Sequence, residues 1–232
     1  MKPNSPSLVL YFTACFFAVI FKLLECDSLV VYTKSVIIPL IFIYYFISNN
    51  YKINLNIALI FLFCFTRDVF NVLYFEISPL GAYFSFLMVN LLLLSLSYQD
   101  FKMLKLNKKD RFPIIVFFFF IATVIFTISR LHFENLVLSF YHYLLYAVVL
   151  GILFLLSIIN YIKKTNFAFL NLVIFCLCSM VSDIFFMINK YYLSLYVISV
   201  IQVSVQIFSY FFMVTYFIAN DKYALKQNKE EF

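Results

Sequence analysis

Residues 61–73 read FLFCFTRDVFNVL, an apolar run that carries the adjacent charged residues Arg67 and Asp68 in its middle. A second apolar run at 175–188, FCLCSMVSDIFFMI, carries a lone carboxylate, Asp183, in a similar place. A carboxylate surrounded by hydrocarbon must pair, take up a proton or face water, because burying an isolated charge is costly. The two runs therefore raise the question of which class of protein places carboxylates inside apolar segments.

The composition identifies that class. The chain of 232 residues is 65% hydrophobic and only 12% charged, with two glycines and no tryptophan. A soluble domain of this length cannot bury so much apolar surface, and the part left outside would aggregate. The sequence thus predicts an integral membrane protein.

Charge and cysteine content exclude two other kinds of site. The net charge of +6 is compatible with nucleic-acid binding, but the basic residues lie between apolar runs, as the positive-inside rule of membrane proteins requires. We therefore expect no nucleic-acid partner. The five cysteines fall mostly inside apolar runs, and Cys176 and Cys178 point to different helix faces. Neither a disulfide framework nor a metal site is predicted, and no cofactor is expected.

Eight apolar stretches are long enough to cross a bilayer core of about 30 Å, which takes roughly 20 helical residues. The links between them are short, which predicts antiparallel neighbours. The first stretch resembles a signal peptide but lacks an A-x-A-like cleavage site, so we expect it to be retained as a span. The prediction is an all-α polytopic membrane protein, in which residues 1–232 form a single domain. The eight stretches lie at about 8–24, 29–48, 55–75, 78–98, 112–131, 136–160, 167–188 and 192–219.

The distribution of basic residues predicts the orientation of the eight spans. Twelve basic residues share one side with both termini, whereas the other side has only Arg130 and Lys190, beside Glu25, Asp27, Glu76 and Glu134. This bias places both termini in the cytoplasm. Helical spans favour the inner membrane of a two-membrane cell, so we expect a multi-pass protein of the bacterial cytoplasmic membrane. The twelve are Lys2, Lys52, Lys102, Lys105, Lys108, Lys109, Arg111, Lys163, Lys164, Lys222, Lys226 and Lys229.

Polar residues inside the predicted spans lie at similar depths. The third and seventh spans run outward, which places Asp68 and Asp183 roughly 8–10 Å below the outer end, at about 1.5 Å per residue. Lys34 in the second span and His142 in the sixth reach the same depth from the outer face. The sequence therefore predicts one polar layer in the outer half of the membrane. Residues somewhat nearer the midplane are Asn90, Gln202 and Gln206.

A purely structural role is an alternative for each of these residues. Arg67 and Lys34 could neutralise the aspartates and hold helices together without chemistry. His142, between two tyrosines, could be a hydrogen-bonded packing residue. Asn90 and the Gln202–Gln206 pair could join helices by hydrogen bonds, because residues four apart share a helix face.

An internal repeat is a further hypothesis. The two aspartate-bearing segments align without gaps at an offset of about 115 residues, which superimposes Asp68 on Asp183 and Phe70 on Phe185. A duplicated four-helix unit (a 4+4 repeat) would make the third and seventh spans equivalent and turn them toward one cavity.

Five short motifs resemble those of the YhhN-like membrane proteins, which include the lysoplasmalogenases of animals and bacteria. The resemblance covers the topology of nearly the whole chain but only a handful of residues, the seventh-span motif being the most specific. It implies an eight-helix fold with catalytic residues Asp68 and Asp183, and with Lys34, Asn90 and Gln206 as substrate-binding candidates, to which we add His142. The motifs are YTKSVIIPL (32–40), FTRDVFN (65–71), FLMVNLLL (86–93), VSDIFFMINK (181–190) and VSVQIFSYFF (203–212).

Three positions depart from the family pattern. Arg67 replaces a glycine before the first aspartate, Ser35 follows Lys34 where proline is usual, and Asn90 replaces a histidine. If Arg67 reaches Asp68, it favours the charged form of that carboxyl and makes it a poor proton donor. Adjacent helical residues point about 100° apart, however, so Arg67 could instead face another helix.

The resemblance implies hydrolysis of the vinyl ether of a lysoplasmalogen to a fatty aldehyde and a glycerophospho-headgroup. Such an ether is cleaved by protonating its β-carbon, which leaves an oxocarbenium ion for water to capture. Two aspartates could divide this work, Asp183 as the acid and Asp68 as the base or stabiliser, with Lys34 at the headgroup phosphate. The expected partners are a lysophospholipid or other lipid and the bilayer.

Two other functions remain open. A small transporter or proton-coupled carrier would also place paired charges within its spans, although broken helices are usual there. A non-catalytic membrane protein would use the same charges for helix assembly. The oligomeric state is not predicted from the sequence.

Overall fold

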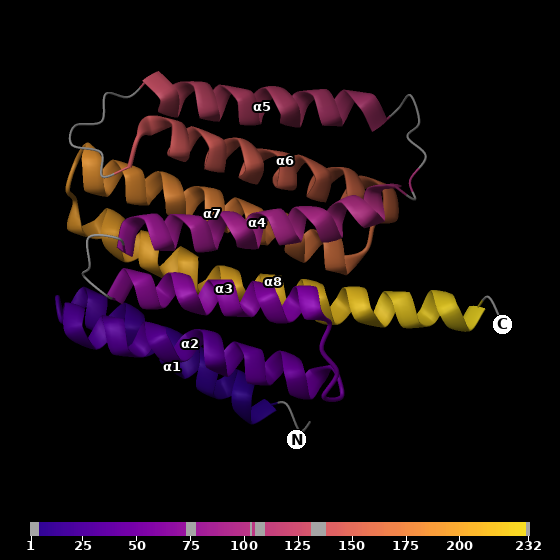
Figure 1. Ribbon diagram of the computed structural model, residues 1–232, viewed down its shortest axis with the longest axis horizontal. Coiled ribbons are helices and arrows are strands. Elements are labelled where there is room, and N and C mark those ends of the chain that lie inside the picture. The colour runs from indigo at the N-terminus through magenta and orange to yellow at the C-terminus, as the bar shows by residue number, and fades with distance from the viewer. Residues whose placement is uncertain (1–4, 73–77, 103, 105–109, 131–137, 231–232) are drawn as a thin grey trace.

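The computed structural model describes residues 5–72, 78–102, 104, 110–130 and 138–230. Within these residues the chain forms eight α-helices and no strand, which confirms the all-α prediction (Figure 1). Each predicted apolar stretch overlaps one of the helices, and α8 extends furthest beyond its stretch, to Glu230 instead of residue 219. They are α1 (Ser5–Leu23), α2 (Asp27–Ser48), α3 (Leu55–Val72), α4 (Ser78–Lys102), α5 (Arg111–Arg130), α6 (Phe140–Lys164), α7 (Phe167–Tyr191) and α8 (Tyr196–Glu230).

Six of the helices are long and apolar enough to cross a membrane, which makes the chain a multi-pass membrane protein. Arg111–Thr127 in α5 is a shorter apolar segment, and α3, which holds Arg67 and Asp68, is not among the six. Eight crossings therefore remain a prediction. The six segments are Pro6–Leu23, Asp27–Ser48, Pro79–Lys102, Phe140–Lys164, Phe167–Tyr191 and Tyr196–Asp221. Six residues used in the orientation argument lie outside the described residues: Lys2, Glu76, Lys105, Lys108, Lys109 and Glu134.

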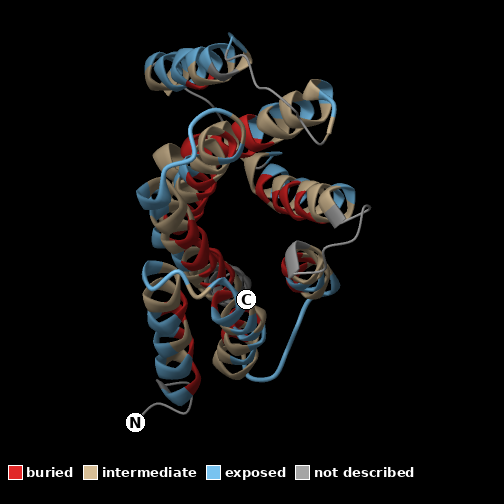
Figure 2. Cartoon of the chain, turned by 90° about the vertical axis from the view of Figure 1, so that its left-hand side faces the viewer, coloured by how far each residue is buried: buried red, intermediate tan, exposed pale blue. Residues whose placement is uncertain are grey.

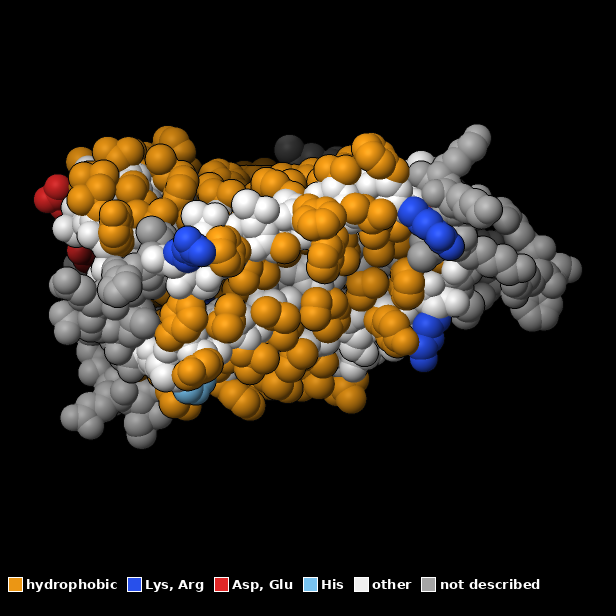
Figure 3. All heavy atoms as spheres, turned by 90° about the horizontal axis from the view of Figure 1, so that it is seen from above, with side chains coloured by type: hydrophobic (Ala, Val, Ile, Leu, Met, Phe, Trp, Pro, Cys, Tyr) orange, Lys and Arg blue, Asp and Glu red, His pale blue; other side chains and the backbone are white. Residues whose placement is uncertain are grey.

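The outer surface of the helices is apolar in the way a lipid environment requires. Large side chains of α5 project outward, with Phe112 76% and Phe119 64% exposed. Figure 3 views the face that carries α5, and hydrophobic side chains cover its middle while lysines and arginines lie toward its two ends. Water would not tolerate so large an apolar patch, whereas hydrocarbon chains would cover it without cost.

Six helices form a closed ring by their contacts. Following the ring, α2 contacts α3, α3 contacts α4, α4 contacts α6, α6 contacts α7, α7 contacts α8, and α8 returns to α2. α1 lies outside this ring against α2 and α8, and α5 lies outside it against α6 (Figures 1 and 2). The α5–α6 contact is close, because a Cβ added at Gly151 would lie 2.9 Å from Cγ2 of Ile121.

Polar side chains join the helices at defined points. The buried Tyr11 hydroxyl donates to the carbonyl of Ile207 at 2.6 Å and so ties α1 to α8. Tyr45 donates to Asp221 at 3.1 Å between α2 and α8. Interhelical hydrogen bonds of this kind replace the hydrophobic driving force that is missing between helices in lipid.

One of these links supports a stability prediction. Asn160 in α6 is fully buried, and its Nδ2 donates to both the carbonyl and the Oγ of Ser97 in α4, at 2.9 and 3.0 Å. Asn160→Leu should lower the free energy of unfolding by about 1–2 kcal/mol, because both interhelical bonds are lost. Thermal unfolding in detergent micelles measures the change.

Asn171→Leu is the matched control. Asn171 is also buried, but its Nδ2 donates only to the carbonyl of Phe167 within its own helix, at 2.7 Å. Asn171→Leu should therefore lower the free energy of unfolding by less than Asn160→Leu does. Equal losses would contradict the view that the α4–α6 link, rather than the burial of an amide, carries the effect.

Candidate functional site

Arg67 faces α7 rather than its neighbour Asp68. Its Nη2 lies 3.8 Å from Oδ1 of Asp183, with both side chains largely buried. The guanidinium carbon also lies 3.7 Å from the centre of the Phe86 ring in α4, in a cation–π contact. The sequence left open whether Arg67 would reach Asp68 or another helix, and the ion pair is formed with the other helix. The charge argument therefore applies to both carboxyls, because Arg67 contacts Asp183 directly and its charge also acts on Asp68, and it no longer selects Asp183 as the proton donor.

Asp183 has a second partner, which the sequence argument missed. The hydroxyl of Tyr146 in α6 donates to Oδ2 of Asp183 at 2.6 Å. Both oxygens of this carboxylate are thus engaged, one by a cation and one by a hydroxyl. Tyr146 lies four residues after His142 and shares its helix face, but it is one of 18 tyrosines and nothing in its sequence context singles it out.

Asp68 is buried, with 4% of its surface exposed, and does not belong to the cavity wall described below. Its Oδ1 has no hydrogen-bond partner among the described residues, and its nearest opposite charges are Lys34 and Arg67. The ammonium group of Lys34 donates to Oε1 of Gln206 in α8 at 3.1 Å. Two cations and two carboxylates therefore form one group across α2, α3 and α7, which balances the charge within the bundle.

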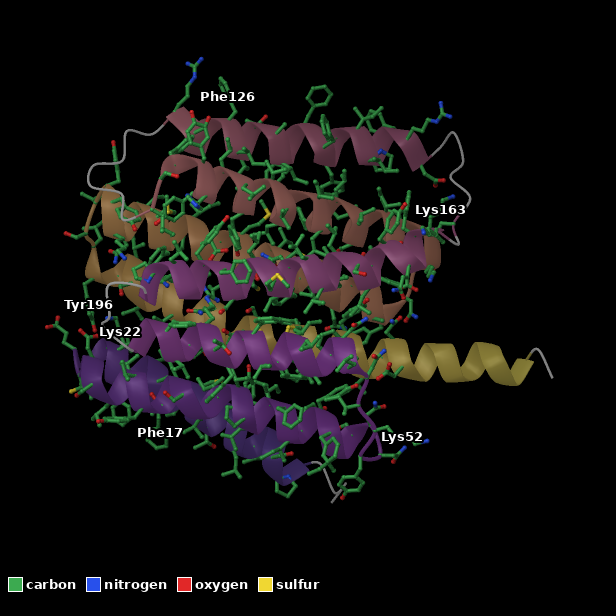
Figure 4. The ribbon with its side chains drawn as sticks, in the orientation of Figure 1. Phe17, Lys22, Lys52, Phe126, Lys163 and Tyr196 are labelled. Carbon is green, nitrogen blue, oxygen red and sulfur yellow. The ribbon has the colours of Figure 1, made fainter. Side chains whose placement is uncertain are left out.

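A cavity of about 630 Å³ opens beside this group. Its wall includes Lys34, Arg67, Tyr146, Asp183 and Gln206. Every helical residue of the wall belongs to the half of its helix at one end of the bundle, the end where Figure 4 labels Lys22 and Tyr196. The volume is in the usual range for small-molecule sites, and the wall combines apolar surface with a few polar groups.

The remaining predicted residues lie around the cavity without forming its wall. Asp68 and Asn90 are buried behind it, and Asn90 lies near the Tyr146 hydroxyl without hydrogen-bond geometry to any described residue. His142 is also outside the wall. Its Nδ1 lies 2.6 Å from Oγ of Ser139, and its ring meets Tyr83 edge to face at 5.4 Å. Of the six predicted site residues, the structure therefore brings Lys34, Asp183 and Gln206 together at the cavity.

The mouth of the cavity carries two further lysines. Lys22 pairs with Asp27 at 2.7 Å, and its carbonyl accepts a hydrogen bond from the Tyr196 hydroxyl (Figure 4). Lys190 lies over the rings of Phe186 and Tyr191, 5.2 and 5.4 Å from their centres. Both lysines belong to the cavity wall. Among the described residues, no three His, Cys, Asp or Glu side chains are grouped so as to hold a metal ion.

The arrangement is that of a pocket within the helix bundle. Among the described residues of its wall there is one carboxylate, which a hydroxyl and a guanidinium contact, and lysines lie nearby. Such a set can donate or accept a proton and can stabilise charge of either sign. Comparisons of the chain with protein families, with curated proteins and with solved structures find no match.

Proposed function

We propose that this chain is an intramembrane lipid hydrolase of the lysoplasmalogenase type, which cleaves the vinyl ether of a single-chain lysophospholipid. The observation that carries the proposal is the position of Asp183, the carboxylate in the wall of an otherwise largely apolar cavity, held by Arg67 and Tyr146. The motif resemblance to the YhhN-like family points to the same chemistry. No cofactor enters the proposed reaction.

The proposed topology accompanies the function. Eight crossings with both termini in the cytoplasm would place the cavity in the outer half of a bacterial cytoplasmic membrane. A headgroup at that depth stays close to water while its chain remains among apolar side chains. Positive-inside charge bias and the antiparallel order of the helices support this placement.

In the proposed mechanism, protonated Asp183 gives its proton to the β-carbon of the vinyl ether. The C=C electron pair forms the new C–H bond, and the adjacent carbon becomes an oxocarbenium ion beside the resulting carboxylate. Arg67 and Tyr146 stabilise that carboxylate, which then takes a proton from the attacking water. The hemiacetal so formed collapses to a fatty aldehyde and the glycerophospho-alcohol, and Asp183 ends protonated as it began.

Asp68 has a supporting part in this scheme. Because it lies behind the cavity wall, it acts through the charge of Arg67 and Lys34 rather than on the lipid. The two-aspartate scheme is thereby kept, with a different division of roles: Asp183 reacts, and Asp68 maintains the charge balance that fixes Arg67 and Lys34.

A non-catalytic lipid-binding or helix-assembly role is the second candidate. The observation that favours it is that both oxygens of Asp183 already have partners, which is the arrangement of a structural ion pair. A transporter role has less support, because the cavity wall is confined to one end of the bundle.

Aldehyde release distinguishes these functions. Purified full-length protein in detergent or nanodiscs should release fatty aldehyde from a lysoplasmalogen and none from the lysophospholipid with a saturated ether at the same position. The saturated ether controls for binding, because it has the same headgroup and chain length but lacks the double bond to be protonated. Binding of both lipids without aldehyde from either would refute the hydrolase and leave the second candidate.

A further inference from the structure

Most of the charged and amide side chains of the cavity wall come from one side of the helix ring. α2, α3 and α8 are consecutive in the ring, with α1 behind them. Of the eight wall residues that these four helices contribute, only Phe70 and Val203 are apolar. The polar side is made by Lys22, Lys34, Arg67, Ser199, Gln202 and Gln206.

The opposite side of the cavity is made by α4 and α6, which are neighbours in the ring, and by α5 behind them. The wall residues described for these three helices include no charged side chain. This apolar side includes Ala82, Val124, Ile125, Leu144 and Ala147, and its polar side-chain atoms are the hydroxyls of Tyr83, Ser129, Tyr143 and Tyr146. α7 lies between the two sides and contributes both Asp183 and hydrophobic residues such as Met180.

Hydrogen-bond capacity on the polar side is biased toward donors. Lys34 uses one N–H on Oε1 of Gln206, and two N–H groups of its ammonium remain. Gln206 is 4% exposed, lines the cavity, and its Nε2 has no hydrogen-bond partner among the described residues. The Tyr210 hydroxyl, one turn further along α8, lies near this amide without hydrogen-bond geometry to it, and a ligand acceptor in the cavity would complete the hydrogen bonding of the amide. Lys190 adds a cation at the mouth.

The geometry points to a ligand that lies across the bundle, with an oxyanion headgroup between α2 and α8 and a single hydrocarbon chain that ends between α4, α5 and α6. This inference rests on the proposed function in taking the cavity as a lipid site with a phosphate at Lys34, and it adds the orientation of the lipid and the role of Gln206. Lys34 and Gln206 are the residues that determine headgroup specificity. A cationic headgroup would meet Lys34, Arg67 and Lys190, whereas a phosphate would accept from Lys34 and Gln206.

Tryptophan quenching tests the orientation without requiring turnover. The chain has no tryptophan, so a single introduced indole reports from one place. Tyr83→Trp in α4 reports from the apolar side, and Tyr196→Trp in α8 reports from beside Lys22. A terminally brominated hexadecyl phosphate should quench the indole of Tyr83→Trp and leave that of Tyr196→Trp largely unquenched, and unbrominated hexadecyl phosphate should reverse the quenching. Equal quenching of both variants, or stronger quenching in Tyr196→Trp, would overturn the orientation.

Binding of matched probes tests the headgroup. Hexadecyl phosphate should bind at least about tenfold more tightly than hexadecanol, and Lys34→Met should remove most of this preference without changing hexadecanol binding, since a charge-assisted hydrogen bond is lost. Lys52→Met, at the other end of the molecule in Figure 4, is the control and should change neither affinity. An unchanged phosphate preference in a Lys34→Met protein with wild-type thermal stability would overturn the headgroup assignment.

The two proposals fail separately. Alkyl phosphates contain no vinyl ether, so their binding is independent of hydrolysis. Oriented binding without aldehyde release would retain this inference and reject the hydrolase. Aldehyde release with reversed quenching would retain the hydrolase and reject the inference.

Discussion

Arg67→Met should lower the free energy of unfolding by about 3–5 kcal/mol, a loss typical of removing one member of a buried ion pair. The guanidinium is 3.8 Å from Asp183 and lies against the ring of Phe86, and it is also one of the two positive charges nearest to buried Asp68. Methionine keeps much of the side-chain length but leaves two carboxylates with Lys34 as the remaining nearby cation. Thermal and denaturant unfolding in one detergent, followed by circular dichroism, measures the loss.

Arg130→Met is the control for this experiment. Arg130 is exposed at the end of α5, where its guanidinium carbon lies 4.5 Å from the centre of the Phe126 ring. Replacing this exposed arginine should lower the free energy of unfolding by less than about 0.5 kcal/mol, as surface substitutions usually do. Combining Arg67→Met with Asp183→Asn should recover part of the loss, because the uncompensated charge disappears with its partner. Additive losses in that double variant would show that the ion pair is not what holds α3 to α7.

The level of the polar residues along the helix bundle could be predicted from the sequence, because it depends only on the position of each residue in its helix and on the direction of that helix. A helix rises about 1.5 Å per residue, and the order of the spans fixes their direction. Counting along the chain therefore placed Lys34 and Asp183 at one level and Gln206 somewhat nearer the midplane, and these three residues meet at the cavity. The apolar stretches likewise mark the helices directly, since each segment must satisfy its backbone hydrogen bonds within itself.

The rotation of each helix about its axis could not be predicted in the same way. An amphipathic pattern normally shows which face is buried, but in α3 the consecutive residues Thr66, Arg67 and Asp68 point in different directions, so the pattern does not show which of them faces the cavity. Neighbouring side chains on a helix point about 100° apart, which is enough for Arg67 to reach Asp183 while Asp68 stays outside the cavity wall. The same uncertainty applies to Asn90 and His142, which share the predicted level but not the cavity wall.

The internal repeat stays a prediction. α1 contacts α2, α3 contacts α4, α5 contacts α6 and α7 contacts α8, as two copies of one unit would. Short connections produce the same pairing in any antiparallel bundle, so the pairing alone does not favour duplication. The surroundings of the two aspartates differ: Asp183 has Arg67 and Tyr146 as direct partners, whereas Oδ1 of Asp68 has no hydrogen-bond partner among the described residues.

Asp183→Asn should reduce aldehyde release from lysoplasmalogen by at least about 100-fold, the usual scale for loss of a general acid. The amide nearly matches the carboxyl in shape and can still accept from Tyr146, but it cannot deliver a proton to carbon. Binding of hexadecyl phosphate should change little, because the proposed headgroup site is formed by Lys34 and Gln206 and not by Asp183. The expected result is therefore a fall in kcat with nearly unchanged KM, measured by steady-state kinetics.

Comparing Asp68→Asn with Asp183→Asn tests whether the two carboxyls have the different roles proposed for them. Because Asp68 lies behind the cavity wall, its loss should reduce kcat by less than about tenfold. Equal losses in the two variants would mean that both carboxyls act on the lipid, and activity retained in Asp183→Asn would reject the mechanism. The Arg67→Met, Asp183→Asn double variant adds the decisive comparison. If it regains stability yet stays inactive, the loss of aldehyde release comes from the missing side chains of the proposed site and not from a weakened fold.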